Sequence, residues 1–202
     1  MTRIKTSERQ IQIVSKATEI IALGGISALT TKELATQLNI KEMILYRCFK
    51  KKEDIILNCI ISARENQIKK WSELINVTKD SKQALKIITK NFTSMPSDKS
   101  LEFMLLQKLV VQNNSEQIQK QLAITFERFA SELEKLLSTF KDNAKSLSWS
   151  LVHWGLGLGI MQLLPLKQVS SQNFQTKQID LLFQLIGLNQ SDFIKDKPQE
   201  NL

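Results

Sequence analysis

The chain has 202 residues, enough for one or two domains at about 150 residues each and for a sizeable buried core. Its 42% hydrophobic and 24% charged residues are ordinary for a water-soluble globular protein and exclude a disordered or fibrous chain. Six glycines and three prolines are too few for many hairpins, so the composition favours an all-helical fold. The net charge of +8 makes a polyanion such as nucleic acid a candidate partner.

The chain has few residues of the kinds that bind metals or form disulfides. Cys48, Cys59 and the single histidine, His153, cannot build a disulfide framework or a clustered zinc site, so we expect no metal and no cofactor. The polar N-terminus lacks the pattern of a secretory signal, and the longest apolar stretch, residues 151–166, is shorter than the roughly 20 residues of a membrane span. These features predict a cytoplasmic protein with no membrane partner.

Apolar residues recur at helical spacing through most of the chain. A first helix of about 16 residues is predicted to end at Gly24 and Gly25, because Ile11, Val14, Ala17, Thr18, Ile21 and Ala22 recur at helical spacing before them. Thr30 and Glu33 fit a capping box that opens a short second helix over 31–38, and Asn39 can end it in the left-handed conformation. The remaining predicted helices, which bring the total to about nine, cover 41–48, 51–75, 81–93, 99–112, 116–140, 144–164 and 174–186.

Half of the surplus positive charge lies in the twelve residues from Lys41 to Lys52, whose net charge is +4. Taken by itself, this charge could simply belong to a solvated lysine-rich face with no binding function. With the short helix over 31–38 and the turn at Asn39 that precede it, the helix over 41–48 completes a helix, a tight turn and a helix, the motif whose second helix enters the major groove of DNA. The residues expected to form the small core beneath it are Leu34, Ala35, Leu38, Ile40, Leu45 and Phe49.

A distributed pattern over about residues 9–56 makes the assignment more specific. It consists of Arg9, Ala17, Gly25, Thr30, Thr31, Leu34, Ala35, Ile40, Leu45, Tyr46, Arg47, Phe49, Lys52 and Glu53. The pattern resembles the DNA-binding head of TetR-family transcriptional regulators. The resemblance implies a sequence-specific homodimer, usually a repressor, that reads a palindromic operator and responds to a ligand. It also implies a DNA-binding domain over 1–52 and a helical regulatory and dimerisation domain over 53–188, followed by a polar tail over 189–202.

The resemblance implies DNA contacts by Thr31, Lys32, Lys41, Glu42, Met43, Ile44, Tyr46 and Lys52. Thr31, Tyr46 and Lys52 would bind phosphate, and Lys32 would reach phosphate or a guanine edge. The recognition helix departs from the family, which usually has serine or threonine at Lys41 and Ile44 and a small residue or proline at Met43. Glu42 can accept a hydrogen bond from cytosine, while Met43 and Ile44 can pack on thymine methyls. A head that keeps its fold but no longer reads sequence is the alternative.

The segment 144–164 is apolar nearly all round, which predicts a helix buried on more than one side. Gly155, Gly157 and Gly159 fall inside this helix with no strand before them, so they do not form a nucleotide-binding motif. The resemblance implies that this helix and 174–186 form a four-helix bundle with a second copy, through Ser148, Val152, Gly155, Gly159, Ile179, Leu182, Phe183 and Ile186. Packing inside one chain is the alternative, because a core needs the same residue types.

A ligand cavity is expected among the central helices, where aromatic area is mixed with a few polar groups. Its candidate lining residues are Phe103, Gln107, Phe126, Phe129, Trp149 and His153. This composition suggests a small apolar or aromatic effector. Ordinary core packing is the alternative for each residue, and His153 equally fits a satisfied buried histidine.

Two other classes of function compete with a DNA-binding regulator. A dimeric helical binding or scaffold protein would explain Glu42, which would face a polyanion, Ile44, which cannot donate to a phosphate, and Cys48, where the family often has histidine or an aromatic residue. Lys32, Tyr46 and Lys52 instead favour DNA binding. An enzyme is disfavoured, since one histidine forms no cluster and no acid–base pair has a distinctive setting.

Overall fold

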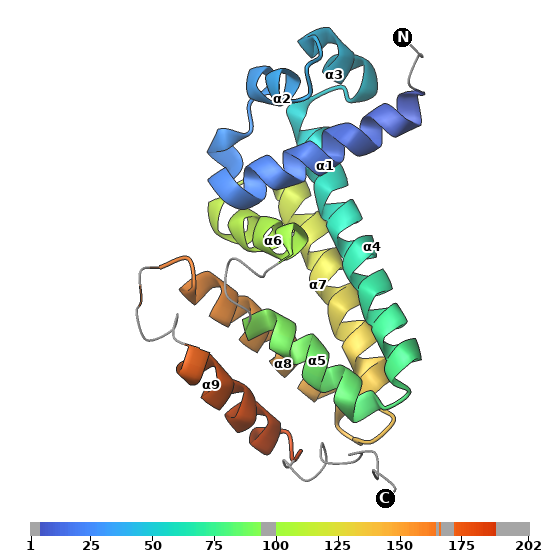
Figure 1. The fold of residues 1–202 in the computed structure, drawn as a ribbon, viewed down its shortest axis with the longest axis vertical. Helices are drawn as coiled ribbons and strands as arrows, with labels where there is room; N and C mark the ends of the chain where they lie inside the picture. Colours follow the sequence, from blue (N-terminus) through green and yellow to red (C-terminus); the bar gives the residue numbers. More distant parts are fainter. Residues whose placement is uncertain (1–4, 94–99, 165, 167–171, 189–202) are drawn as a thin grey trace, which may run out of the picture. The chain divides into compact units, whose positions relative to one another are not determined.

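A computed structural model describes residues 5–93, 100–164, 166 and 172–188, and within these ranges the chain is all-helical. The nine α-helices and one short 3₁₀ helix, η1, of this described part follow one another without an intervening strand (Figure 1). Their bounds are α1 Thr6–Gly24, η1 Ile26–Ala28, α2 Thr31–Gln37, α3 Glu42–Cys48, α4 Lys52–Thr78, α5 Ser81–Thr93, α6 Leu101–Gln112, α7 Glu116–Leu137, α8 Ala144–Met161 and α9 Gln172–Leu185. The predicted fold class and the existence of each predicted helix are confirmed.

The buried face of α1 differs from the full row of apolar residues that predicted the helix. Ile11 is 69% exposed, whereas Ile13, Ala17 and Ile20 are buried. Positions 13, 17 and 20 are spaced i, i+4 and i+7, so they form a single stripe on a helix. The rotation of a helix about its axis is set by its neighbours, and an apolar residue at the edge of the stripe can remain in solvent.

Local sequence signals explain the helix ends near the N-terminus. Thr30 caps α2, and its side chain accepts a hydrogen bond from the backbone N–H of Glu33 at 3.0 Å. The Glu33 carboxylate accepts a bond from Gln37, one turn further along the same helix, at 2.6 Å. Asn39 has the predicted left-handed backbone, with φ of 50°. Gly25, between α1 and η1, has φ of 81° and ψ of 179°, a conformation that is essentially reserved for glycine.

The chain forms two compact units. The first comprises Met1–Lys69 and Ser100–Phe129, and in it α1 packs against α6, α2, α3 and η1. The second comprises Lys70–Lys99 and Ala130–Leu202, and in it α5 packs against α8 and α9. These units are defined by packing. The predicted boundary at residue 52 separates a DNA-binding domain from a regulatory domain by function, and it stays a prediction. The predicted polar tail, 189–202, lies outside the described residues.

Cys59 belongs to the core of the first unit. Its side chain is fully buried, and its thiol donates to the backbone oxygen of Val14 at 3.5 Å. Burial raises the pKa of Cys59 to about 12, so the thiol stays protonated and unreactive at neutral pH. In the described ranges no three potential metal ligands cluster, and no described helix is long and apolar enough to cross a membrane.

Candidate nucleic-acid interface

The short helices α2 and α3 pack against each other and form a helix-turn-helix. The turn is closed by backbone hydrogen bonds from Asn39 to Thr36 and from Ile40 to Ala35, each of 3.0 Å. Four of the six predicted core residues are buried, and the other two are half-buried. The buried side chains are those of Leu34, Ala35, Leu45 and Phe49, and the half-buried ones are those of Leu38 and Ile40.

The outward face of α3 carries Met43, Tyr46 and Arg47. Their spacing of i, i+3 and i+4 places them on one face of the helix. Met43 is 68% exposed and Tyr46 is 54% exposed, while Leu45 between them is buried. This helix therefore presents an apolar side chain, a phenol and a guanidinium to solvent, a set that can contact base edges and phosphate.

The other predicted recognition residues lie at the beginning of α3. Lys41 is the N-cap residue, and both Lys41 and Glu42 are exposed. Ile44 is half-buried, so only part of its side chain can contact a partner. Each of the four predicted recognition residues, Lys41 to Ile44, is thus at least partly accessible to a partner.

The predicted phosphate contacts lie on α2 and at the start of α4. Lys32 is exposed and Thr31 is half-buried in the first turn of α2. Lys52 is exposed, and its ammonium donates to the backbone oxygen of Leu29 at 3.2 Å. This bond uses one of the three ammonium hydrogens and holds the start of α4 beside the segment before α2.

Two glutamines bind backbone groups in and just before the helix-turn-helix, and the sequence predicted neither contact. Gln10 in α1 donates through Nε2 to the backbone oxygen of Cys48, at the end of α3, at 3.1 Å. Gln112 in α6 accepts at Oε1 from the backbone N–H of Ile26 at 3.0 Å. These partners are 38 and 86 residues apart in the chain, and no local sequence pattern indicates either contact.

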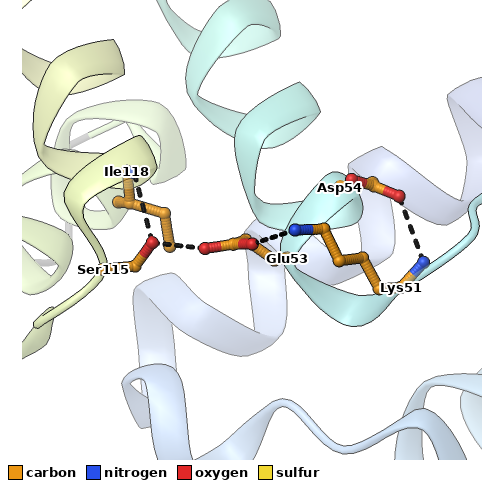
Figure 2. A network of polar contacts seen from close by, with 5 residues as sticks. All are labelled: Lys51, Glu53, Asp54, Ser115 and Ile118. Carbon is orange, nitrogen blue, oxygen red and sulfur yellow. Dashed lines mark hydrogen bonds and ion pairs between the residues drawn. The ribbon is translucent and has the colours of Figure 1, made fainter.

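A polar network joins the start of α4 to the segment before α7 (Figure 2). The Glu53 carboxylate accepts hydrogen bonds from the ammonium of Lys51 and from the hydroxyl of Ser115. The Ser115 hydroxyl oxygen accepts from the N–H of Ile118 at 3.5 Å, and the N–H of Lys51 donates to Asp54 at 3.1 Å. Lys51 therefore has an internal partner, so part of the basic segment's charge is used within the fold.

The same network shifts the pKa values of both charged partners. The hydrogen bond from Lys51, and then that from Ser115, lower the pKa of Glu53, although partial desolvation opposes them. The hydrogen bond to Glu53 is likewise the main reason that the pKa of Lys51 is raised. Both shifts favour the charged forms that make the contact.

We expect the stabilisation from Glu53 to disappear in acid. A carboxyl whose pKa is lowered by folding stabilises the fold above its unfolded pKa of about 4.3, and the contribution is lost as the pH falls through the lower folded pKa. The melting temperature of wild type should thus exceed that of Glu53→Gln at pH 7, and the gap should close below about pH 4. Thermal melts across this pH range test the expectation.

Glu116→Gln is the matched control for this acid effect. The ion pair of Glu116 with Lys120 is at least 72% exposed on both sides, and exposed pairs stabilise little. A pH-independent gap between wild type and Glu53→Gln would contradict the linkage.

The six predicted ligand residues fall into two groups. Phe103, Gln107, Phe126 and Phe129 lie in the first compact unit, where Gln107 and Phe129 are buried and the other two are half-buried. Phe126 and Phe129 pack edge to face, with ring centroids 6.2 Å apart. Trp149 and His153 lie in the second unit with ring centroids 5.7 Å apart. His153 is exposed, so the alternative of a buried histidine is wrong for the single chain.

An open groove in the head is a separate feature. It has a volume of about 440 Å³ and is lined by Glu19, Ile20, Leu23, Ala28, Thr30, Glu33 and Gln37. None of the six predicted ligand residues lines it. Its two carboxylates make it a poor site for phosphate, which is consistent with DNA contact elsewhere on the head.

All eight residues predicted at the dimer interface are buried within the single chain. The small residues Ser148, Val152, Gly155 and Gly159 lie on α8, which packs against α5, and the other four lie on or just after α9, which also packs against α5. Burial therefore favours the alternative of an intramolecular core for Ser148, Val152, Gly155, Gly159, Ile179, Leu182, Phe183 and Ile186. The apolar residues that remain exposed on these helices include Met161, Leu181 and Leu185.

A family model described as "Bacterial regulatory proteins, tetR family" matches residues 13–59, which contain most of α1, the helix-turn-helix and the start of α4. No curated protein sequence matches the chain significantly.

Solved structures resemble nearly the whole chain. A TetR transcriptional regulator from Legionella pneumophila is 21% identical, with a TM-score of 0.72 over 92% of this chain and 99% of that one. A TetR-family regulator from Agrobacterium tumefaciens is 12% identical, with a TM-score of 0.73 over 88% and 98%. A transcriptional regulator from Saccharomonospora viridis, in complex with choline, is 18% identical, with a TM-score of 0.72 over 88% and 96%. These likenesses show a shared fold.

Proposed function

Because the chain belongs to the TetR family of bacterial transcriptional regulators, which binds DNA through its helix-turn-helix, we propose that it is a homodimeric repressor of a palindromic operator. A small, largely apolar ligand controls its binding to DNA in this proposal. A regulator of transcription works beside the chromosome, so a cytoplasmic location follows. Family membership also confirms the prediction that the chain is not an enzyme.

The outward face of α3 is the observation that carries the DNA-reading part of the proposal. Leu45 is buried and anchors the helix, whereas Met43 and Tyr46 are more than half exposed. Met43 is too apolar to bind phosphate and too exposed to serve the core. Contact with a thymine methyl in the major groove explains such a residue at this position.

The homodimer in this proposal uses surface that the single chain leaves open. On α8, His153 and Gly157 are exposed and Met161 is 42% exposed, and their spacing of four residues places them on one face. On α9, Leu181 is 48% exposed and Leu185 is 75% exposed, also one turn apart. A second copy of the chain would remove these apolar side chains from water.

The experiment that tests the proposal is selection of bound sequences from a random double-stranded DNA pool at near-physiological salt. We expect enrichment of a palindrome whose half-site contains thymine. Met43→Ala should change the preferred base at one position and weaken wild-type operator binding by about tenfold, because a base contact contributes on the order of 1–3 kcal/mol.

Val77→Ala is the control, since Val77 is an 82% exposed apolar residue at the end of α4, outside the helix-turn-helix. It should leave both affinity and preference unchanged. If no sequence is enriched and binding vanishes as salt rises, the head has lost specific recognition and the scaffold alternative takes precedence.

A further inference from the structure

The open groove of the head is formed by α1, η1 and α2, and α1 packs against both of the other helices (Figure 1). Its lining residues are Glu19, Ile20 and Leu23 of α1, Ala28 of η1, and Thr30, Glu33 and Gln37 of α2 and its N-cap. None of the eight predicted DNA contacts lines it. The groove is therefore a surface that the proposed binding of the operator does not use.

Part of this groove is apolar. Leu23 is 63% exposed, Ile20 beside it is buried, and Ala28 is half-buried. A single exposed leucine is common on a protein surface, but this one lines a hollow of about 440 Å³. An apolar side chain placed there would remove Leu23 from water, which is favourable.

The polar part of the groove is acidic, although the head as a whole is basic. Residues 1–52 contain ten lysines and arginines but only four acidic residues. Two of those four, Glu19 and Glu33, line the groove. Helix α1 also has no basic residue in its last turn, so no side chain of that turn offsets the partial negative charge of the helix end. The groove therefore favours a cationic occupant.

Both carboxylates can accept further hydrogen bonds. Glu19 accepts from the ammonium of Lys16 at 2.5 Å, and its side chain remains 40% exposed. Glu33 accepts from Gln37 at 2.6 Å and is exposed. A carboxylate offers about four acceptor sites on two oxygens. An incoming ammonium or guanidinium group can thus bind either one without breaking the internal contact.

We propose that the groove docks a basic amphipathic segment of a partner protein, with an aliphatic side chain against Leu23 and lysine or arginine side chains at Glu19 and Glu33. An open groove fits a peptide segment, which keeps one side in water, better than a small molecule, which needs most of its surface buried. DNA does not fit, because its phosphates would face two carboxylates. Only the availability of the groove on the operator complex rests on the proposed function.

The probe is a random library of peptides of about twelve residues, displayed on phage and selected on the full-length protein. We expect enrichment of sequences in which lysine or arginine flanks an aliphatic residue. The most enriched peptide is then synthesised and titrated. The double variant Glu19→Gln, Glu33→Gln should bind it about tenfold more weakly, because two exposed ion pairs are lost. Leu23→Ala should weaken binding by about fivefold.

Matched controls come from the other end of the same helix. Glu8 is exposed in the first turn of α1, Ile11 is 69% exposed, and neither lines the groove. Glu8→Gln and Ile11→Ala should bind the peptide like wild type. The charge-reversed double variant Glu19→Lys, Glu33→Lys should instead select acidic peptides, an outcome that a purely structural role of the two glutamates would not produce.

Three results would overturn the inference: no enriched peptide, enriched peptides without basic residues, or equal binding to wild type and to the Glu19→Gln, Glu33→Gln variant. Sedimentation without peptide tests a second copy of the chain as the occupant. We expect Leu23→Ala to leave the assembly state unchanged at micromolar concentration. A change would make the groove an interface between copies and reject the partner protein.

Titration of the peptide into the operator complex tests whether the groove stays free on DNA. Its affinity should remain within about threefold of that for the free protein. The complex of the Glu19→Gln, Glu33→Gln variant measures how much basic peptide the DNA itself binds. Displacement of the peptide by the operator would contradict separate surfaces. Absence of operator binding, with the peptide still bound, would reject the regulator and keep the docking groove.

Discussion

Gly25→Ala is expected to destabilise the protein by about 2–4 kcal/mol, the sum of backbone strain and a lost hydrogen bond. The backbone at Gly25 has φ of 81° and ψ of 179°, which alanine adopts only with strain. An added Cβ would also lie 2.5 Å from Gln112 Oε1, the atom that accepts the hydrogen bond from Ile26. Urea unfolding of the two proteins measures the difference.

Two further variants separate strain from collision at Gly25. Gln112→Ala should cost only about 1 kcal/mol, because it removes the hydrogen bond and leaves the glycine in place. The double variant should be less destabilised than the sum of the single ones, since the collision is gone while the backbone strain persists. A double variant as stable as Gln112→Ala alone would show that the backbone conformation at Gly25 carries no strain.

Gly187→Ala is the comparison for the left-handed backbone by itself. Gly187 has φ of 68°, and an added Cβ would approach only the end of the flexible Lys141 side chain, at 3.0 Å. We expect about 1 kcal/mol of destabilisation, because the side chain can move away and strain alone remains. Two results together would contradict a collision between the added Cβ and Gln112. The destabilisation of the double variant would equal the sum of those of Gly25→Ala and Gln112→Ala, and Gly187→Ala would be as destabilising as Gly25→Ala.

Local signals explain why the helices and their ends could be predicted from the sequence. Thr30 and Asn39 act through bonds and dihedral angles within a few residues of themselves, so their roles are visible in the chain. The inward residues Leu45 and Phe49 follow helical spacing and are buried as predicted. The helix-turn-helix is therefore encoded almost entirely in its own residues.

The long-range polar contacts between helices of the first compact unit could not be predicted. Gln10, Gln112 and Ser115 bond to partners 38, 86 and 62 residues away, and each is an ordinary polar residue on an ordinary helix or loop. Apolar periodicity also fails to distinguish a core from an interface, because both bury the same residue types. The family resemblance assigned the stripe that begins at Ser148 to an interface with a second copy, whereas these residues are buried within the single chain.

Leu185→Glu is expected to convert the proposed dimer to a monomer and to weaken operator binding by about 100-fold or more. Leu185 is 75% exposed in the single chain, so a glutamate there is solvated and leaves the fold of the monomer intact. In a dimer the same carboxylate would be desolvated against apolar surface, which is strongly unfavourable. A monomer engages one half-site at a time and loses the effective concentration that links the two heads, a factor of about 10²–10⁴.

Sedimentation at micromolar concentration and operator titration check the two parts of this expectation together. Val77→Glu introduces the same charge at an 82% exposed apolar residue of α4, which the proposal places outside the interface. It should remain dimeric and bind the operator like wild type. Because both variants add one negative charge, a general electrostatic loss of DNA affinity would lower both equally. A specific loss in Leu185→Glu, accompanied by a monomer, would link the exposed face of α9 to operator binding, whereas a dimeric Leu185→Glu would exclude that face from the interface.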